Sequence, residues 1–192
     1  LLQIGFIKIM GYNIGTFRFI SLIFGTTALY IFYKIAKNFT NSTFLANMVT
    51  IMLGIDIQFT YASHFARQEI ILVLILLIAL YYFQDKYSYQ NSIYQDITMG
   101  LILGTAIGIH PNSFVIALPF ILIYTYNLLI DNKIKFKNYF TFGGTLGLMA
   151  LLFVVISFKF DPNFINNYTS YGESLGVTNS ILTKLDMLDY FY

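Results

Sequence analysis

A histidine, an arginine and a glutamate fall within six residues, at His64, Arg67 and Glu69, directly before a long apolar run. The planar guanidinium of arginine binds phosphate oxygens through paired hydrogen bonds and keeps its charge. A glutamate accepts a proton, or holds a cation that neutralises a phosphate leaving group. This stretch therefore indicates the rim of an anion site at a helix end. The alternative is an ordinary helix end, with an Arg that reaches the membrane surface and a solvated Glu.

A second imidazole, His110, lies in the stretch GIHPNSF. Pro111 has no backbone donor and disfavours helix at the residue before it, so the chain is expected to turn there. His110 is expected to contact an anionic ligand or a metal, or else to be a plain polar turn residue. The chain has no Cys and no HxH or HxxxH pair. No metal site is therefore predicted within it.

Four polar residues, in the second apolar segment and directly after it, recur at helical spacing: Asp56, Thr60, His64 and Arg67. On one continuous helix they form a polar stripe. An Asp inside a membrane costs about 2.5–3.5 kcal/mol on insertion scales, so it is expected to face protein or a water-filled cavity. Asp56 is therefore a candidate intramembrane polar site. The alternative is an inert Asp, hydrogen-bonded against a neighbouring helix.

The composition sets the class of protein that must position these groups. Of 192 residues, 57% are hydrophobic and 10% are charged, whereas a soluble domain has about 25% charged residues. A packed core cannot hide so much apolar surface, so the chain is predicted to be an all-α integral membrane protein that contacts membrane lipids. A net charge of +2 is too small to indicate a nucleic-acid partner.

Six apolar segments predict a polytopic transmembrane helical bundle of about six spans: residues 16–36, 44–62, 70–83, 97–109, 113–130 and 139–158. A span needs about 20 residues, so the third and fourth need their polar flanks to cross, or line a protein-walled cavity. The glycines of FGGTLG, in the sixth, are expected to allow close helix packing. The predicted parts are an outer interfacial segment at 1–15, a transmembrane core at 16–160 and the start of an extracytoplasmic loop at 161–192.

Lysines predict the orientation, because basic residues concentrate in cytoplasmic loops. The loops after the first, third and fifth segments hold Lys34, Lys37, Lys86, Lys133, Lys135 and Lys137. The short loops on the opposite side hold only Arg67 as a basic residue. The lysine side is therefore predicted to be cytoplasmic, which places His64, Glu69 and His110 on the outer side.

Three motifs follow one another along the chain: RFI at 18–20, SHFARQE at 63–69 and GIHPNSFVIALP at 108–119. In this order they resemble the Arg-Leu-Pro, Ser…Ala-Arg-Pro-Asp and Gly…Lys-Pro…Leu-Pro patterns of the dolichyl-phosphate-mannose protein mannosyltransferases. These patterns also occur in the bacterial aminoarabinose-transferase-like relatives, which are lipid-linked-sugar glycosyltransferases of the GT-C type. The resemblance covers about residues 6–160. Gln68 departs from a common Pro, and His110 from a frequent Lys.

The resemblance implies a membrane glycosyltransferase that moves a sugar from a polyprenyl-phosphate donor to an acceptor at the outer face of a bacterial or archaeal plasma membrane. It also implies cationic groups, sometimes with a divalent metal ion, that stabilise the departing phosphate. Arg67, Glu69, His64 and His110 are the candidates for that rim. The family's catalytic acid precedes the position of Arg18, and residues 1–17 hold no acid. The expectation is therefore an internal fragment, inactive alone, whose catalytic base lies upstream.

Two other classes of function stay open. A polytopic transporter or a lipid-carrier translocase would have Asp56 on its substrate path, although no internal repeat is visible. A membrane scaffold without a ligand is the third possibility. The gathering of acids and imidazoles on one predicted face favours a ligand site over a scaffold.

Overall fold

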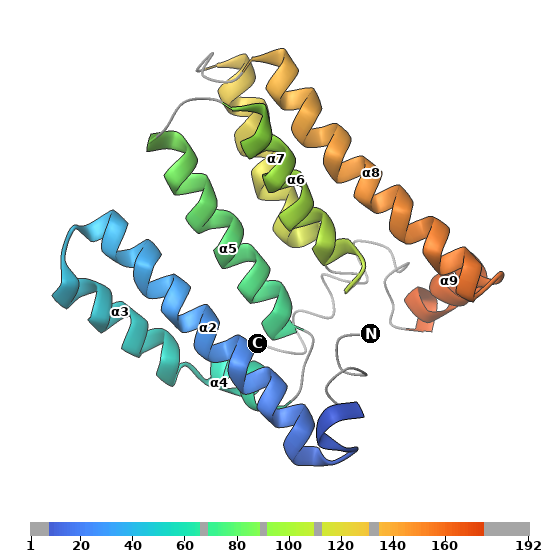
Figure 1. The fold of residues 1–192 in the computed structure, drawn as a ribbon, viewed down its shortest axis with the longest axis horizontal. Helices are drawn as coiled ribbons and strands as arrows, with labels where there is room; N and C mark the ends of the chain where they lie inside the picture. Colours follow the sequence, from blue (N-terminus) through green and yellow to red (C-terminus); the bar gives the residue numbers. More distant parts are fainter. Residues whose placement is uncertain (1–7, 66–68, 89–91, 110–112, 131–134, 175–192) are drawn as a thin grey trace, which may run out of the picture. The chain divides into compact units, whose positions relative to one another are not determined.

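The computed structural model describes residues 8–65, 69–88, 92–109, 113–130 and 135–174, and within these ranges the chain is helical and has no strand (Figure 1). The all-α prediction is confirmed. The main helices are α2 (Ile14–Thr40), α3 (Thr43–Ile55), α4 (Ile57–His64), α5 (Glu69–Ser88), α6 (Ile93–Ile107), α7 (Ser113–Leu129), α8 (Phe136–Phe160) and α9 (Phe164–Ser174). The chain divides into two compact units, residues 1–150 and residues 151–192.

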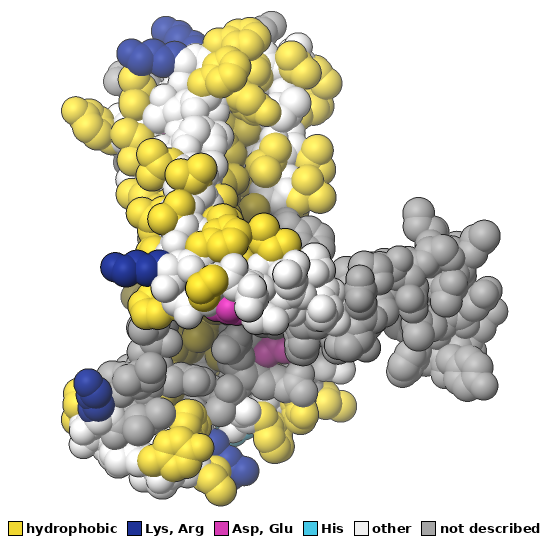
Figure 2. Space-filling model, turned by 90° about the vertical axis from the view of Figure 1, so that its right-hand side faces the viewer, with side chains coloured by type: hydrophobic (Ala, Val, Ile, Leu, Met, Phe, Trp, Pro, Cys, Tyr) yellow, Lys and Arg dark blue, Asp and Glu magenta, His cyan; other side chains and the backbone are white. Residues whose placement is uncertain are grey.

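Helix length and composition identify the membrane-spanning elements. Among the described residues, α2 and α8 are each long and apolar enough to cross a membrane, and the bent pair α3 and α4 is a third candidate. The helices α5, α6 and α7 are apolar but shorter. Hydrophobic side chains cover much of the face in Figure 2, as contact with lipid requires. The chain is therefore an integral membrane protein, with two or three spans identified by these criteria.

Local capping explains the hairpin of α2 and α3. The Asn13 side chain accepts a hydrogen bond from the backbone N–H of Thr16 at 2.8 Å and so begins α2. Asn41 ends the helix with a left-handed backbone, at a φ of 51°. Ser42 then caps α3 by accepting from the backbone N–H of Leu45 at 3.3 Å. The chain therefore reverses within two residues, and α3 packs back along α2.

The second span is not the continuous helix that the sequence predicted. The chain bends by 65° between α3 and α4. At the bend Asp56 has an extended backbone, and its side chain accepts a hydrogen bond from the backbone N–H of Phe59 at 2.8 Å. Asp favours such caps over a helix interior. The predicted polar stripe is therefore divided: an exposed Asp56 stands at the break, and Thr60 and His64 follow on α4.

The first unit is built around α2 and α5. In the chain from 8 to 150, α2 packs against α3, α4 and α5, and α5 packs against α6 and α7. Figure 1 shows that α2, α5 and α7 end, and that α6 begins, toward the same end of this unit. That end carries Lys34, Lys37, Lys135 and Lys137, whereas Lys8 precedes α2 at the opposite end. The sorting of most lysines to one end agrees with the sequence pattern, while the membrane face that this end meets stays a prediction.

Close helix packing occurs at α6, not at the FGGTLG stretch of α8. A Cβ on Gly100 would lie 2.8 Å from the Cβ of Thr145, and a Cβ on Gly104 would lie 2.6 Å from the Cβ of Met149. Among the described residues, nothing lies within 4 Å of a Cβ on the α8 glycines Gly143, Gly144 and Gly147. Within this part of the chain, the prediction that the FGGTLG glycines allow close packing is therefore wrong. The glycines that allow it belong to α6, and α8 provides the larger side chains.

The second unit holds the end of α8 and α9, a helix where the sequence indicated only a polar loop. Asp161 explains this helix, because its Oδ1 accepts from the backbone N–H of Asn163 at 3.0 Å and its Oδ2 accepts from Asn167 Nδ2 at 2.8 Å. The rings of Phe158 and Phe164 pack edge to face at 6.0 Å. The predicted loop therefore begins with an ordered helix, and its residues 175–192 lie outside the described part of the chain.

Candidate functional site

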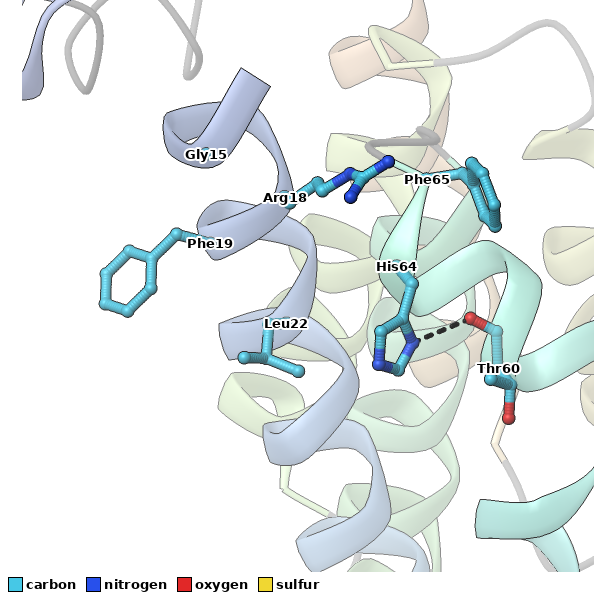
Figure 3. Close-up of a pocket in the computed structure, with 7 residues that line it drawn as sticks. All are labelled: Gly15, Arg18, Phe19, Leu22, Thr60, His64 and Phe65. Atoms are coloured by element: carbon cyan, nitrogen blue, oxygen red, sulfur yellow. Dashed lines mark hydrogen bonds between the residues drawn. The ribbon is translucent and has the colours of Figure 1, made fainter. Parts of the chain in front are cut away.

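A pocket of about 610 Å³ lies between α2 and α4, toward the end of the first unit that is opposite the lysines (Figure 3). Its described lining comprises Gly15, Arg18, Phe19, Leu22, Thr60, His64 and Phe65. Two of these side chains are basic and none is acidic. The lining is otherwise mainly apolar, and an apolar wall strengthens the field of a charge beside it. The pocket therefore suits a negatively charged group attached to an apolar body.

A glycine brings the two walls together. A Cβ on Gly25 of α2 would lie 2.6 Å from the Cβ of Ser63 on α4, so only glycine permits this approach. Ser63 is buried, and its hydroxyl donates to the carbonyl oxygen of Thr60 at 3.1 Å. This contact fixes α4 against α2 within one turn of His64.

The imidazole of His64 has a defined orientation. Its Nδ1 lies 2.9 Å from the carbonyl oxygen of Thr60 and 3.0 Å from the Ser63 hydroxyl oxygen. A carbonyl oxygen only accepts, so Nδ1 carries a hydrogen and donates to it. The other ring nitrogen, Nε2, turns toward the side of the pocket formed by α2 (Figure 3). It accepts a hydrogen bond in the neutral ring and donates one in the protonated ring.

Arg18 brings a permanent cation to the same pocket. The central carbon of its guanidinium lies 5.8 Å from the centre of the Phe65 ring, within the range of a cation–π interaction. Figure 3 shows Arg18 reaching from α2 toward Phe65, on the same side of the pocket as His64. In the sequence, Arg18 stands out through the family motif at 18–20, and nothing local links it to His64.

The predicted rim residues take different positions. Glu69 begins α5 and lines a separate pocket of about 380 Å³, together with Gln58 and Tyr61 of α4. A carboxylate in a first turn also interacts favourably with the helix dipole. Among the described residues, His64 and Glu69 thus line pockets on different parts of α4, and Asp56 lines neither. Arg67 and His110 lie outside the described residues.

No described cluster could hold a metal ion. Within the ranges 8–65, 69–88, 92–109, 113–130 and 135–174, no three side chains of His, Cys, Asp or Glu come together as metal ligands would. The involvement of a divalent ion, which the resemblance allowed, stays a prediction.

The sequence analysis missed a buried carboxylate, Asp96, near the start of α6. It is fully buried; the hydroxyl of Tyr124 donates to its Oδ1 at 3.0 Å, and Asn138 Nδ2 donates to its Oδ2 at 2.5 Å. The two donors come from α7 and α8. Asp96 stands immediately before the predicted fourth span, and the sequence offered no reason to single it out. The signal that could have found it is the spacing of Asp96, Gly100 and Gly104 on one helix face.

The comparisons with known proteins agree with the motifs. A family model described as dolichyl-phosphate-mannose-protein mannosyltransferase matches residues 1–158. Searches of curated proteins and of solved structures found no match. The family consists of membrane glycosyltransferases of the GT-C type that use a lipid-linked sugar donor. Because the match covers most of the chain, including the pocket of Arg18 and His64, the chain belongs to the dolichyl-phosphate-mannose-protein mannosyltransferase family.

Proposed function

We propose that the protein moves a sugar from a polyprenyl-phosphate donor to an acceptor at the outer membrane face, and that the pocket between α2 and α4 receives the donor phosphate. The observation that carries this proposal is the convergence of Arg18 and His64 from two helices on one apolar-walled pocket. The pocket lies at the end of the first unit that is poor in lysine, and the positive-inside rule predicts the outer side for that end. Family membership supports the lipid-linked donor.

The pocket chemistry fits the departure of a phosphate. When the bond between the anomeric carbon and the phosphate oxygen breaks, negative charge develops on that oxygen. Arg18 supplies a fixed positive charge, and its cation–π contact with Phe65 favours an orientation of the guanidinium toward the pocket. His64 offers Nε2, which donates a hydrogen bond when the ring is protonated. The acceptor needs a base, and the resemblance places that base upstream of Arg18.

The test uses the full-length protein in proteoliposomes with a radiolabelled polyprenyl-phosphate sugar. Arg18→Ala removes a charged hydrogen bond of about 1.5–3 kcal/mol, so donor turnover is expected to fall by roughly 10- to 100-fold. Arg18→Lys is expected to recover only part of the activity, because an ammonium lacks the planar fork.

The matched control is Lys34→Ala. Lys34 lies on the same helix, with its Nζ 5.4 Å from the centre of the Tyr30 ring, but at the lysine-rich end. It also loses a cation–π contact, yet it is expected to keep wild-type turnover. Equal activity in the Arg18→Ala and Lys34→Ala variants would exclude the pocket as the phosphate site. Movement of a polyprenyl phosphate across the bilayer without sugar transfer would instead identify a translocase.

A further inference from the structure

The helices α6 and α8 meet along a narrow seam. Asp96, Gly100 and Gly104 are four residues apart and so share one face of α6. Opposite them on α8 lie, in order, Asn138, then Phe142 and Thr145, then Met149. The contacts advance in the same direction along both helices, so the two helices run parallel. Along this seam the glycines of α6 let the backbone of α8 approach closely.

A polar cluster closes the seam at the lysine-bearing end. Asp96 accepts from Asn138 of α8 and from Tyr124 of α7, so its carboxylate joins three helices. Asp96 and Tyr124 are fully buried, and Asn138 is 4% exposed. The Tyr124 ring also stacks on Phe142 with ring centres 4.1 Å apart. All three polar side chains are thus held within the helix packing.

The glycine contacts and the polar cluster differ in how strongly they fix the axial position of α8 against α6. Gly100 and Gly104 are about one turn apart and leave similar space for side chains of α8. Apolar packing alone therefore distinguishes poorly between two axial positions of α8 that differ by one turn, about 5.4 Å. The polar cluster does distinguish these positions. A shift by one turn would separate the Asp96 carboxylate from the Asn138 amide and break their hydrogen bond inside the helix packing, which costs free energy. A buried polar pair is best established as a device that fixes register, at some cost in stability.

We propose that Asp96, Tyr124 and Asn138 form a register lock, which selects one axial position of α8 against α6 and α7. This role is independent of sugar transfer and of the pocket between α2 and α4. It assigns a purpose to a carboxylate that the chemistry of the pocket does not use. The lock predicts that exchange of the two partners restores the pair, and that mixed registers occur when the cluster is made apolar. The second effect is one that a stabilising contact alone would not give.

The exchange experiment uses the full-length protein in detergent and measures its melting temperature. Asn138→Asp places two carboxylates in contact within a buried site, so the melting temperature is expected to fall. Adding Asp96→Asn recreates a carboxylate and amide pair with the partners exchanged, and most of the loss is expected to return. If the double variant melts no higher than Asn138→Asp alone, the proposed pairing is overturned.

The register experiment measures the distance between spin labels by pulsed electron resonance. Cysteines are introduced at Tyr94 on α6 and Leu148 on α8, which are 81% and 62% exposed, and this chain has no native cysteine. With the native cluster a single distance is expected. The apolar variant carries Asp96→Val, Tyr124→Phe and Asn138→Val, and replacing all three partners limits the loss of stability.

In the apolar variant a second distance is expected, displaced by an amount on the order of one helical turn, about 5.4 Å. A single unchanged distance in the folded apolar variant would overturn the register lock. If the apolar variant does not fold, the exchange experiment still tests the pairing, because the double variant keeps one carboxylate and one amide in the cluster.

Discussion

The close contact at α6 predicts opposite effects for the same substitution on two helices. Gly104→Ala adds a Cβ that would lie 2.6 Å from the Cβ and 2.8 Å from the Cγ of Met149. The Met149 side chain can rotate, but its Cβ is fixed to the backbone, so α6 and α8 must separate. Gly147→Ala, on α8, adds a Cβ that has no described neighbour within 4 Å. The two variants therefore make the same chemical change in contrasting surroundings.

The magnitudes follow from two terms. Replacing Gly by Ala inside a helix contributes about 0.8–1.0 kcal/mol in favour of the helix, and this term is common to both variants. Overpacking costs about 1–3 kcal/mol and applies only at Gly104. The free energy of unfolding is therefore expected to rise by about 1 kcal/mol for Gly147→Ala. For Gly104→Ala it is expected to be about 1–3 kcal/mol lower than for the α8 variant.

The assay is unfolding of the purified protein in mixed detergent micelles, followed by loss of helical circular dichroism. Gly100→Ala tests the same seam one turn earlier, where the added Cβ would meet the Phe142 carbonyl oxygen at 3.0 Å. Backbone atoms cannot rotate away, so this variant is expected to lose at least as much as Gly104→Ala. Equal stability of Gly104→Ala and Gly147→Ala would refute the packing of α6 against α8.

Two further predictions concern the bend and the orientation. Asp56→Asn keeps an oxygen that can cap α4, so this variant is expected to keep its stability and its turnover. Asp56→Ala is expected to lower the free energy of unfolding, measured by melting, by about 1 kcal/mol. A loss of activity in Asp56→Asn would instead indicate that Asp56 lies on a substrate path. Single cysteines at Gln68 and Asn167 are expected to react with an impermeant thiol reagent added outside cells, and one at Gln90 is not; the reverse pattern would contradict the outer position of the pocket.

Composition and periodicity were enough to predict the apolar helices, because these depend on properties that each segment carries by itself. The apolar segments and the sorting of most lysines to one end are of this kind. The bend at Asp56 was missed because helical spacing assumes a straight helix. An Asp in that position has a competing option, which is to bond the backbone of the next turn.

Long-range contacts account for what the sequence did not reveal. Two glycine-containing stretches looked equally suited to close packing, and only the approach of α8 distinguishes Gly100 and Gly104 from Gly143 and Gly147. Asp96 was not singled out because its hydrogen-bond partners, Tyr124 and Asn138, lie 28 and 42 residues away. A local sequence pattern cannot predict hydrogen-bond partners that are so far apart along the chain.

The bend at Asp56 also explains why the pocket exists. The eight residues of α4 extend about 12 Å, so a bend of 65° displaces the far end of the helix by a similar distance. A straight continuation of α3 would carry His64 along the direction of α3. The bend lets α4 pack on α2, where Gly25 accepts the close approach of Ser63. His64 then shares a pocket with Arg18. Asp56 therefore acts on the site through backbone geometry: its cap determines where the imidazole lies, although its carboxylate lies outside the pocket.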